Sequence, residues 1–163
     1  MAVKKLNSMR LLEQHNIPYE VIEFPDTIHD ALELAEAVGV PPHMVYKTLV
    51  VDTGDSKKPL LALIAAHRRL DLKKLAAAAG FKKLTMAPHA SAEQWTGLKT
   101  GGISPLALVA KNWKVFIDQP ATQLQQIMLS AGQRGVNLRV PIQSLLQVLK
   151  PTIAEISDDG DEQ

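Results

Sequence analysis

Several residue types and patterns are scarce or absent in this chain of 163 residues, and each of them excludes a class of structure or function. There is no cysteine, so the chain forms no disulfide and offers no thiol nucleophile, which predicts a reducing, cytoplasmic setting. Aromatic residues make up only 4%, too few for the stacking platforms of modules that bind single-stranded RNA. No apolar run approaches the length of a membrane span. The five histidines match no metal-ligand spacing, and we expect neither a metal nor a cofactor.

What remains is enough for one aliphatic core. A hydrophobic content of 46% over this length predicts a single domain, which we place at residues 1–156. Residues 157–163 are acidic, and we expect them to form a disordered tail.

The net charge of +1 conceals an uneven distribution. Between residues 57 and 114 the only acids are Asp71 and Glu93, against these cations: Lys57, Lys58, Arg68, Arg69, Lys73, Lys74, Lys82, Lys83, Lys99, Lys111 and Lys114. Such a basic middle suits nucleic-acid phosphates, with an affinity that falls as salt rises. The alternative is that each Lys-Lys pair is a solvated end of a helix or strand.

Apolar periodicity and helix-capping signals predict an α+β fold, because helices and strands interleave without a regular β-α-β period. The predicted helices cover residues 7–15, 30–38, 71–79, 121–126 and 142–149, with a helical turn at 91–95. The predicted strands cover residues 19–24, 45–51, 60–66, 83–86, 114–118, 127–130 and 136–140. We expect the hairpin of 45–51 and 60–66 to be the centre of a mixed sheet.

Lys47 is the most informative single residue, because it stands alone in an apolar strand, Val45 to Val51. An unpaired buried ammonium is unfavourable, whereas a strand can display it into a pocket where an anionic ligand pairs with it. The alternative is a half-buried lysine whose stem packs on the sheet while its head reaches water.

Two glycine-containing segments supply further candidates. In Gly101-Gly102-Ile103-Ser104-Pro105 the backbone is free to approach a ligand, and its N–H groups with the Ser104 hydroxyl predict a cradle for an oxyanion or phosphate. A plain turn is the alternative, and the loop lacks the Lys-Ser/Thr of a P-loop. The segment 130–140 reads as a hairpin turning at Gly132 and Gly135, with Arg134 either functional or an exposed tip charge.

In this order, these segments resemble the YbaK family of aminoacyl-tRNA deacylases, which is related to the editing domain of bacterial prolyl-tRNA synthetases. The likeness runs from about Leu11 to Leu149 and rests on these segments: Val45 to Val50, Leu70 to Ala76, Gly80 to Lys83, Thr96-Gly97, Gly101 to Pro105, and Ser130 to Gly135. It implies a curved, partly closed mixed sheet flanked by helices. It also implies cleavage of the ester between a wrong amino acid and the 3′ end of a tRNA, most closely Cys-tRNA(Pro).

The resemblance also assigns residues and partners. It makes Lys47 the catalytic residue and aminoacyl-tRNA the substrate, with prolyl-tRNA synthetase as a partner that lends tRNA specificity. The substrate-binding set we expect is Tyr19, His29, Thr48, Gly101, Gly102, Ile103, Ser104, Pro105, Ser130, Gly132, Arg134 and Asn137.

Two departures keep other interpretations open. Many relatives carry an acidic residue where this chain has Asn137, and an aromatic-Gly pair where it has Thr27 to Ala31. The alternatives are removal of alanine or serine, or a module that binds aminoacyl-tRNA or a synthetase without catalysis. Since we find no Ser-His-Asp arrangement and no cysteine, either the substrate thiol or a water molecule must attack the ester.

Overall fold

The computed structural model describes residues 4–159 and has an α+β fold, as predicted. The α-helices are α1 (Asn7–Gln14), α2 (Ala31–Val38), α3 (Leu72–Ala79), α4 (His89–Thr96) and α5 (Ile142–Leu149). The strands are β1 (Glu20–Glu23), β2 (Tyr46–Asp52), β3 (Leu60–Ala65), β4 (Arg69–Leu70), β5 (Thr85–Met86), β6 (Val115–Asp118), β7 (Gln126–Gln133), β8 (Val136–Pro141), β9 (Thr152–Ala154) and β10 (Ser157–Asp158). Short 3-10 helices lie between them: η1 (Pro42–Met44), η2 (Pro105–Ala107), η3 (Val109–Lys111) and η4 (Gln119–Gln123).

The described strands form three sheets rather than the one that the sequence suggested. The largest has the order β5-β2-β3-β6-β9 and is mixed, because β2 pairs antiparallel with β3 and β5 while β6 runs parallel to β3 and β9. The others are an antiparallel sheet β1-β8-β7 and the pair β10-β4. The predicted hairpin of β2 and β3 is therefore confirmed near the centre of the largest sheet.

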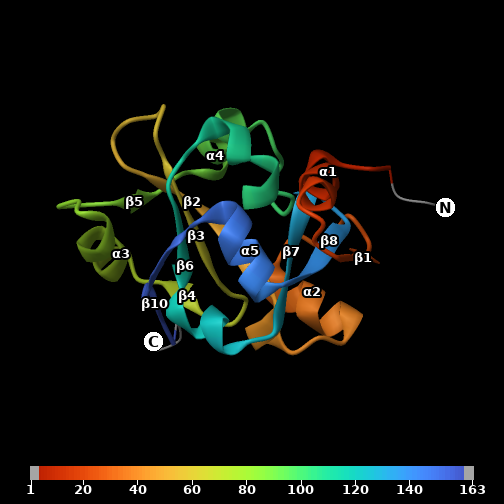
Figure 1. Cartoon of the computed structure of the whole chain (residues 1–163). Coiled ribbons are helices and arrows are strands. Elements are labelled where there is room, and N and C mark those ends of the chain that lie inside the picture. Colours follow the sequence, from red (N-terminus) through yellow and green to blue (C-terminus); the bar gives the residue numbers. More distant parts are fainter. Residues whose placement is uncertain (1–3, 160–163) are drawn as a thin grey trace.

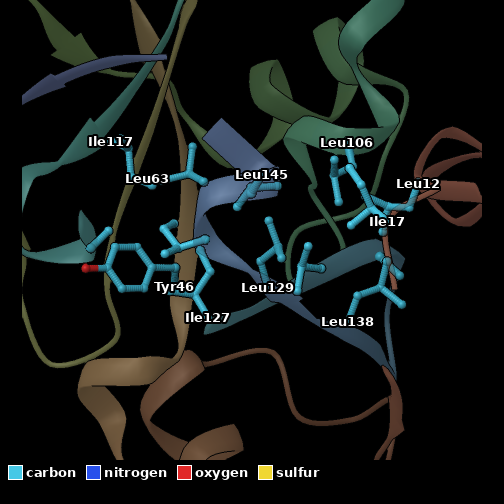
Figure 2. Close-up of a cluster of buried hydrophobic side chains, with 14 of the residues drawn as sticks. Leu12, Ile17, Tyr46, Leu63, Leu106, Ile117, Ile127, Leu129, Leu138 and Leu145 are labelled. Atoms are coloured by element: carbon cyan, nitrogen blue, oxygen red, sulfur yellow. The ribbon is translucent and has the colours of Figure 1, made fainter. Parts of the chain in front are cut away.

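The main core fills the space between the two larger sheets. Figure 2 shows Tyr46, Leu63 and Ile117 from the five-stranded sheet facing Leu129 and other aliphatic side chains of the opposite layer. Helix α5 covers this core, and its Leu145 is fully buried. In Figure 1, α2 and α4 lie beyond opposite ends of the space between the sheets, and α3 covers the outer side of the larger sheet.

Helix ends are fixed by local chemistry. The Asp71 side chain accepts hydrogen bonds from the first-turn N–H groups of α3, and Gly80 ends that helix with φ +80°. The Asp30 side chain caps α2 in the same way by accepting the N–H of Glu33, 3.2 Å away. This cap fixes where α2 begins, and Asp30 with the first turn of α2 lines the cavity described below.

The prediction that residues 157–163 form a disordered tail is wrong for Ser157 and Asp158. They form β10 and pair with β4, and the Ser157 hydroxyl donates to the buried carboxylate of Asp118. Asp118 also accepts the N–H of Ile156 at 2.9 Å. These hydrogen bonds compensate for burying the polar groups of Ser157 and Asp118, which is why this part of an acidic segment is ordered. Residues 160–163 lie outside the described residues. In residues 4–159, no helix is long and apolar enough to cross a bilayer.

Candidate functional site

A cavity of about 430 Å³ lies along the open edge of β2, in the size range of small-ligand sites. Strand β5 pairs with β2 only at Val51 and Asp52, so the preceding residues of β2 have no strand neighbour on that side until Val45 bridges to Met128. The cavity is closed by the N-terminal part of α2, by α4, by the loop around Gly101, and by Ser130 and Asn137 of β7 and β8.

The strand edge offers peptide groups to this cavity. In an antiparallel pair, the N–H and C=O groups of alternate residues point to opposite edges. The carbonyl of Val45 accepts from Ala66 on the β3 side, whereas the carbonyl of Val50 accepts from Ala87 on the open side. By this alternation the N–H and C=O of Thr48 face the open edge, where no strand of the described residues pairs with them.

Lys47 lines the same cavity, and its side chain is half-buried. Its Nζ donates to the carbonyl of Ala66, 3.3 Å away, which is its one hydrogen bond to the described residues. Burial lowers the pKa of this ammonium, and the negative charge of Asp30 partly opposes the shift. An ammonium has three donors, so Lys47 keeps donors for a ligand.

Three further polar groups in the cavity wall have no partner in the described residues. The hydroxyls of Thr48 and Thr100 are buried without a hydrogen bond. The side-chain amide of Asn137 makes none either, although this residue is only 3% exposed. Buried polar groups are normally hydrogen-bonded, so the Thr48 hydroxyl and the Asn137 amide are poised for a bound molecule. The Thr100 hydroxyl instead lies near the Glu93 carboxylate and helps to lower its pKa.

The two glycines of the 101–105 loop serve close packing more than anion binding. A Cβ on Gly102 would lie 2.8 Å from the backbone nitrogen of Arg134, and one on Gly101 would lie 3.1 Å from the Cα of His29. The Gly102 N–H is already bonded to the carbonyl of Lys99 at 2.7 Å. Of the two glycine N–H groups, only that of Gly101 has no hydrogen bond in the described residues.

Two side chains form hydrogen bonds with the backbone of Thr100, the residue before these glycines. The Nε of Arg134 donates to the carbonyl of Thr100 at 2.6 Å, and the N–H of Thr100 donates to a carboxylate oxygen of Glu93 at 2.8 Å. That backbone hydrogen bond is the main cause of the lowered pKa of Glu93. Arg134 is therefore neither a pocket residue nor a free tip charge, because it fixes the loop that forms one cavity wall.

The structure brings together about half of the predicted substrate-binding set. His29, Thr48, Gly101, Ile103, Ser130 and Asn137 line the cavity with Lys47. The sequence pointed to the segment Thr27 to Ala31, which contains Ile28 and Asp30, but not to these two as site residues. It missed Thr100 and the rest of the apolar wall, which includes Leu34, Val50, Met86, Ala87 and Ala92. Asp30 carried a helix-start signal and Val50 lay inside the motif, but the other residues had no local signal.

The remaining predicted residues lie outside the cavity lining. Ser104 is fully buried, and its hydroxyl accepts the N–H of Leu106 at the start of η2. Pro105 opens the same 3-10 helix. The Tyr19 hydroxyl donates to Glu13, 2.6 Å away, which raises the pKa of Tyr19 to about 12. Gly132, with φ +105°, packs against Ala107, and none of these four residues lines the cavity.

In residues 4–159, no three His, Asp or Glu side chains are gathered as metal ligands. His29 is exposed, and its Nε2 lies 2.9 Å from the carbonyl of Asp26. The expectation of no metal and no cofactor stays a prediction.

Known proteins resemble this chain over most of its length. Residues 26–148 match the family described as the aminoacyl-tRNA editing domain. A protein of Enterococcus faecalis (strain ATCC 700802 / V583), named as a candidate Cys-tRNA(Pro)/Cys-tRNA(Cys) deacylase, EbsC, is 35% identical over 156 residues, which are 94% of each chain. A proline–tRNA ligase of Desulforamulus reducens (strain ATCC BAA-1160 / DSM 100696 / MI-1) is 29% identical over 66% of this chain and 18% of the ligase.

Among solved structures, a candidate trans-editing enzyme for prolyl-tRNA synthetase has the same fold. The TM-score is 0.77 at 24% identity, and the match covers 96% of this chain and 99% of the other. At this identity the likeness concerns the fold alone.

Proposed function

The chain belongs to the aminoacyl-tRNA editing domain family, and from this premise we propose that it deacylates mischarged tRNA in trans, with Cys-tRNA(Pro) as its main substrate. The relative from Enterococcus faecalis is named as a deacylase of this kind, and the match covers 94% of its length. The observation on which the proposal depends most is that polar groups with spare hydrogen-bonding capacity converge on one cavity: the Lys47 ammonium, the Thr48 strand edge and the Asn137 amide.

Ester cleavage places negative charge first on the carbonyl oxygen and then on the departing ribose oxygen. Lys47 supplies a compact cation for the second charge or for the neighbouring phosphate. The N–H groups of Gly101 and Thr48 are the backbone donors available for the first. The side-chain oxygen of Asn137 and the carbonyl of Thr48 would accept hydrogen bonds from the α-ammonium of the amino acid.

The attacking group comes from the substrate or from water. In a cysteinyl ester, the substrate thiolate attacks its own carbonyl carbon, the carbon–oxygen bond to ribose breaks, and the ribose oxygen takes up a proton. Two potential protein bases in the wall are already engaged, Asp30 with the N–H of Glu33 and His29 with the carbonyl of Asp26. His89 lines the cavity without a hydrogen bond to the described residues, and we assign it as the base of a water route because both its ring nitrogens are free.

The identity of the removed amino acid, the cytoplasmic location and the association with prolyl-tRNA synthetase are parts of the same proposal. The apolar wall suits a small side chain such as that of cysteine or alanine. A module that holds aminoacyl-tRNA without cleaving it is the competing function, because Asn137 cannot act as a base.

The test is a deacylation assay with labelled Cys-, Ala- and Ser-tRNA(Pro), using the full chain and its Lys47→Ala variant. We expect the full chain to release cysteine fastest and Lys47→Ala to lose at least a hundredfold in rate. Protection of the ester from spontaneous hydrolysis would instead support the binding module. Equal losses of cysteine and alanine turnover in a His89→Gln variant would contradict the thiol route, because alanine has no thiol and must be released by water.

A further inference from the structure

Six lysines gather at one end of the five-stranded sheet, the end where β2 stops and β3 starts. We call this surface the lysine end, and it consists of Lys57, Lys58, Lys82, Lys83, Lys111 and Lys114.

Strand register brings these distant residues together. Thr85 of β5 pairs with Asp52, so Lys82 and Lys83 enter the sheet beside the turn that carries Lys57 and Lys58. Val115 of β6 pairs with Leu61, which puts Lys114 at the same end. The indole of Trp113 donates to the carbonyl of Lys57 at 3.0 Å, and the Nζ of Lys111 lies 5.3 Å from the centre of that ring.

The charges of the lysine end are not neutralised within residues 4–159. None of its six ammonium groups forms an ion pair there. The two nearby carboxylates, Asp52 and Asp55, accept backbone N–H groups of the β2–β3 turn. The opposite end of the sheet differs, because Arg68 pairs with Asp159 and Arg69 with Asp158.

The lysine end lies directly beside the cavity. Met86 lines the cavity and is three residues from Lys83, while Val50 lines it two residues before the end of β2, about 7 Å along the strand. The other side of the cavity is acidic. No lysine or arginine occurs between Arg10 and Lys47, and residues 20–36 carry Glu20, Glu23, Asp26, Asp30, Glu33 and Glu36.

We propose that the lysine end binds backbone phosphates of the acceptor arm of the RNA whose 3′ end enters the cavity. This inference rests on the proposed function. An esterified 3′ end is continuous with a chain of phosphates, so the RNA must leave the cavity across a neighbouring surface. The acidic side with α2 repels those phosphates, the arginines near β10 are already paired, and the lysine end has free cations. Recognition of this kind is independent of base sequence.

Two double variants test the surface: Lys57→Glu with Lys58→Glu, and Lys82→Glu with Lys83→Glu. The hydrogen bonds of Lys57 and Lys58 within the described residues involve only their backbone atoms, so the turn keeps its bonds in the variant. The matched control is Lys4→Glu with Arg10→Glu, which has the same charge change. Figure 1 shows α1, which contains Arg10, on the side of the molecule away from the β2–β3 turn.

Binding of uncharged tRNA, followed by fluorescence anisotropy between 50 and 300 mM salt, measures the surface without the chemistry. We expect each lysine pair to weaken binding about tenfold and to flatten the slope of log Kd against log salt by about 1 to 2. The control should bind like the unmodified chain. Equal binding by all four proteins, or an equal loss in the control, would overturn the proposal. Equal binding by all four is also the result expected if this surface instead binds an acidic protein.

Cleavage of a short substrate separates this inference from the proposed function. A 3′-aminoacyl adenosine has no phosphate, so the lysine variants should cleave it at the rate of the unmodified chain. If no protein cleaves either that ester or aminoacyl-tRNA, the deacylase proposal is wrong, whereas the binding measurements still decide the role of the lysine end.

Discussion

Replacing Gly102 by alanine adds one methyl group where the cavity loop meets the β7–β8 turn. An ideal Cβ at this position lies 2.8 Å from the backbone nitrogen of Arg134 and 2.9 Å from the carbonyl carbon of Gln133. Both neighbours are backbone atoms, so no side chain can rotate away. The φ angle of Gly102 is not in the left-handed region, and therefore the perturbation is steric alone.

The magnitude follows from the overlap. Overpacking by one methyl group costs about 1 to 3 kcal/mol when the surroundings are well packed. For a chain of this size, 2 kcal/mol lowers Tm by about 4 to 8 °C. Relief of the clash moves the loop by several tenths of an ångström or more. A displacement of about 1 Å near a reacting group can lower kcat/KM about a hundredfold.

The control is Gly80→Ala at the end of α3. Gly80 has φ +80° and no atom within 4 Å of its ideal Cβ, so alanine there costs roughly 1 to 2 kcal/mol of backbone strain without a clash. We expect both variants to lose Tm by differential scanning calorimetry, but only Gly102→Ala to lose deacylation rate. A Gly102→Ala protein with unchanged Tm and kcat/KM would refute the packing role assigned to this loop.

Three further predictions concern single side chains. Burial lowers the pKa of Lys47 below 10.5, so the unfolded chain binds that proton more tightly than the folded chain does. The stability of the unmodified chain relative to Lys47→Met should therefore rise as pH increases from 7 towards 10.5. The same difference in urea midpoint between the two proteins at both ends of this range would contradict the prediction. Thr48→Val removes a buried hydroxyl without a partner, so unfolding should need equal or more urea while kcat/KM falls about tenfold, and the opposite pattern would show a structural role. Ser157→Ala leaves Asp118 short of a donor, which should cost about 1 to 3 kcal/mol in urea unfolding without changing activity, whereas exposed Ser56→Ala should cost nothing measurable.

The parts of the fold that could be predicted are those specified by neighbouring residues. Asp71 and Gly80 delimit α3 because a side-chain cap and a left-handed residue act within one turn. The region 121–126 was predicted as a helix, but the structure has the 3-10 helix η4 followed by the start of β7 at Gln126. Strands β9 and β10 carry no alternating pattern, and their partners β6 and β4 are distant in sequence, so no local signal revealed them.

The site residues also divide into those with a local signal in the sequence and those without one. Lys47 could be singled out because an ammonium in an apolar strand needs a reason, and the cavity along β2 provides one. Ser104 looked like a ligand donor but caps η2, since a hydroxyl before proline suits both roles equally well. The position of Thr100 depends on hydrogen bonds of its backbone with Glu93 and Arg134, which lie on two other elements, and composition or spacing could not reveal it.

The position of β10 has a practical consequence for handling the protein. A version shortened after residue 156, the boundary that composition suggested, would remove the hydroxyl on which both Asp118 and the Nε of Arg68 depend. It would also remove the carboxylate that neutralises the Arg68 guanidinium. Trimming that removes Ser157 and Asp159 should therefore lower stability and expression yield.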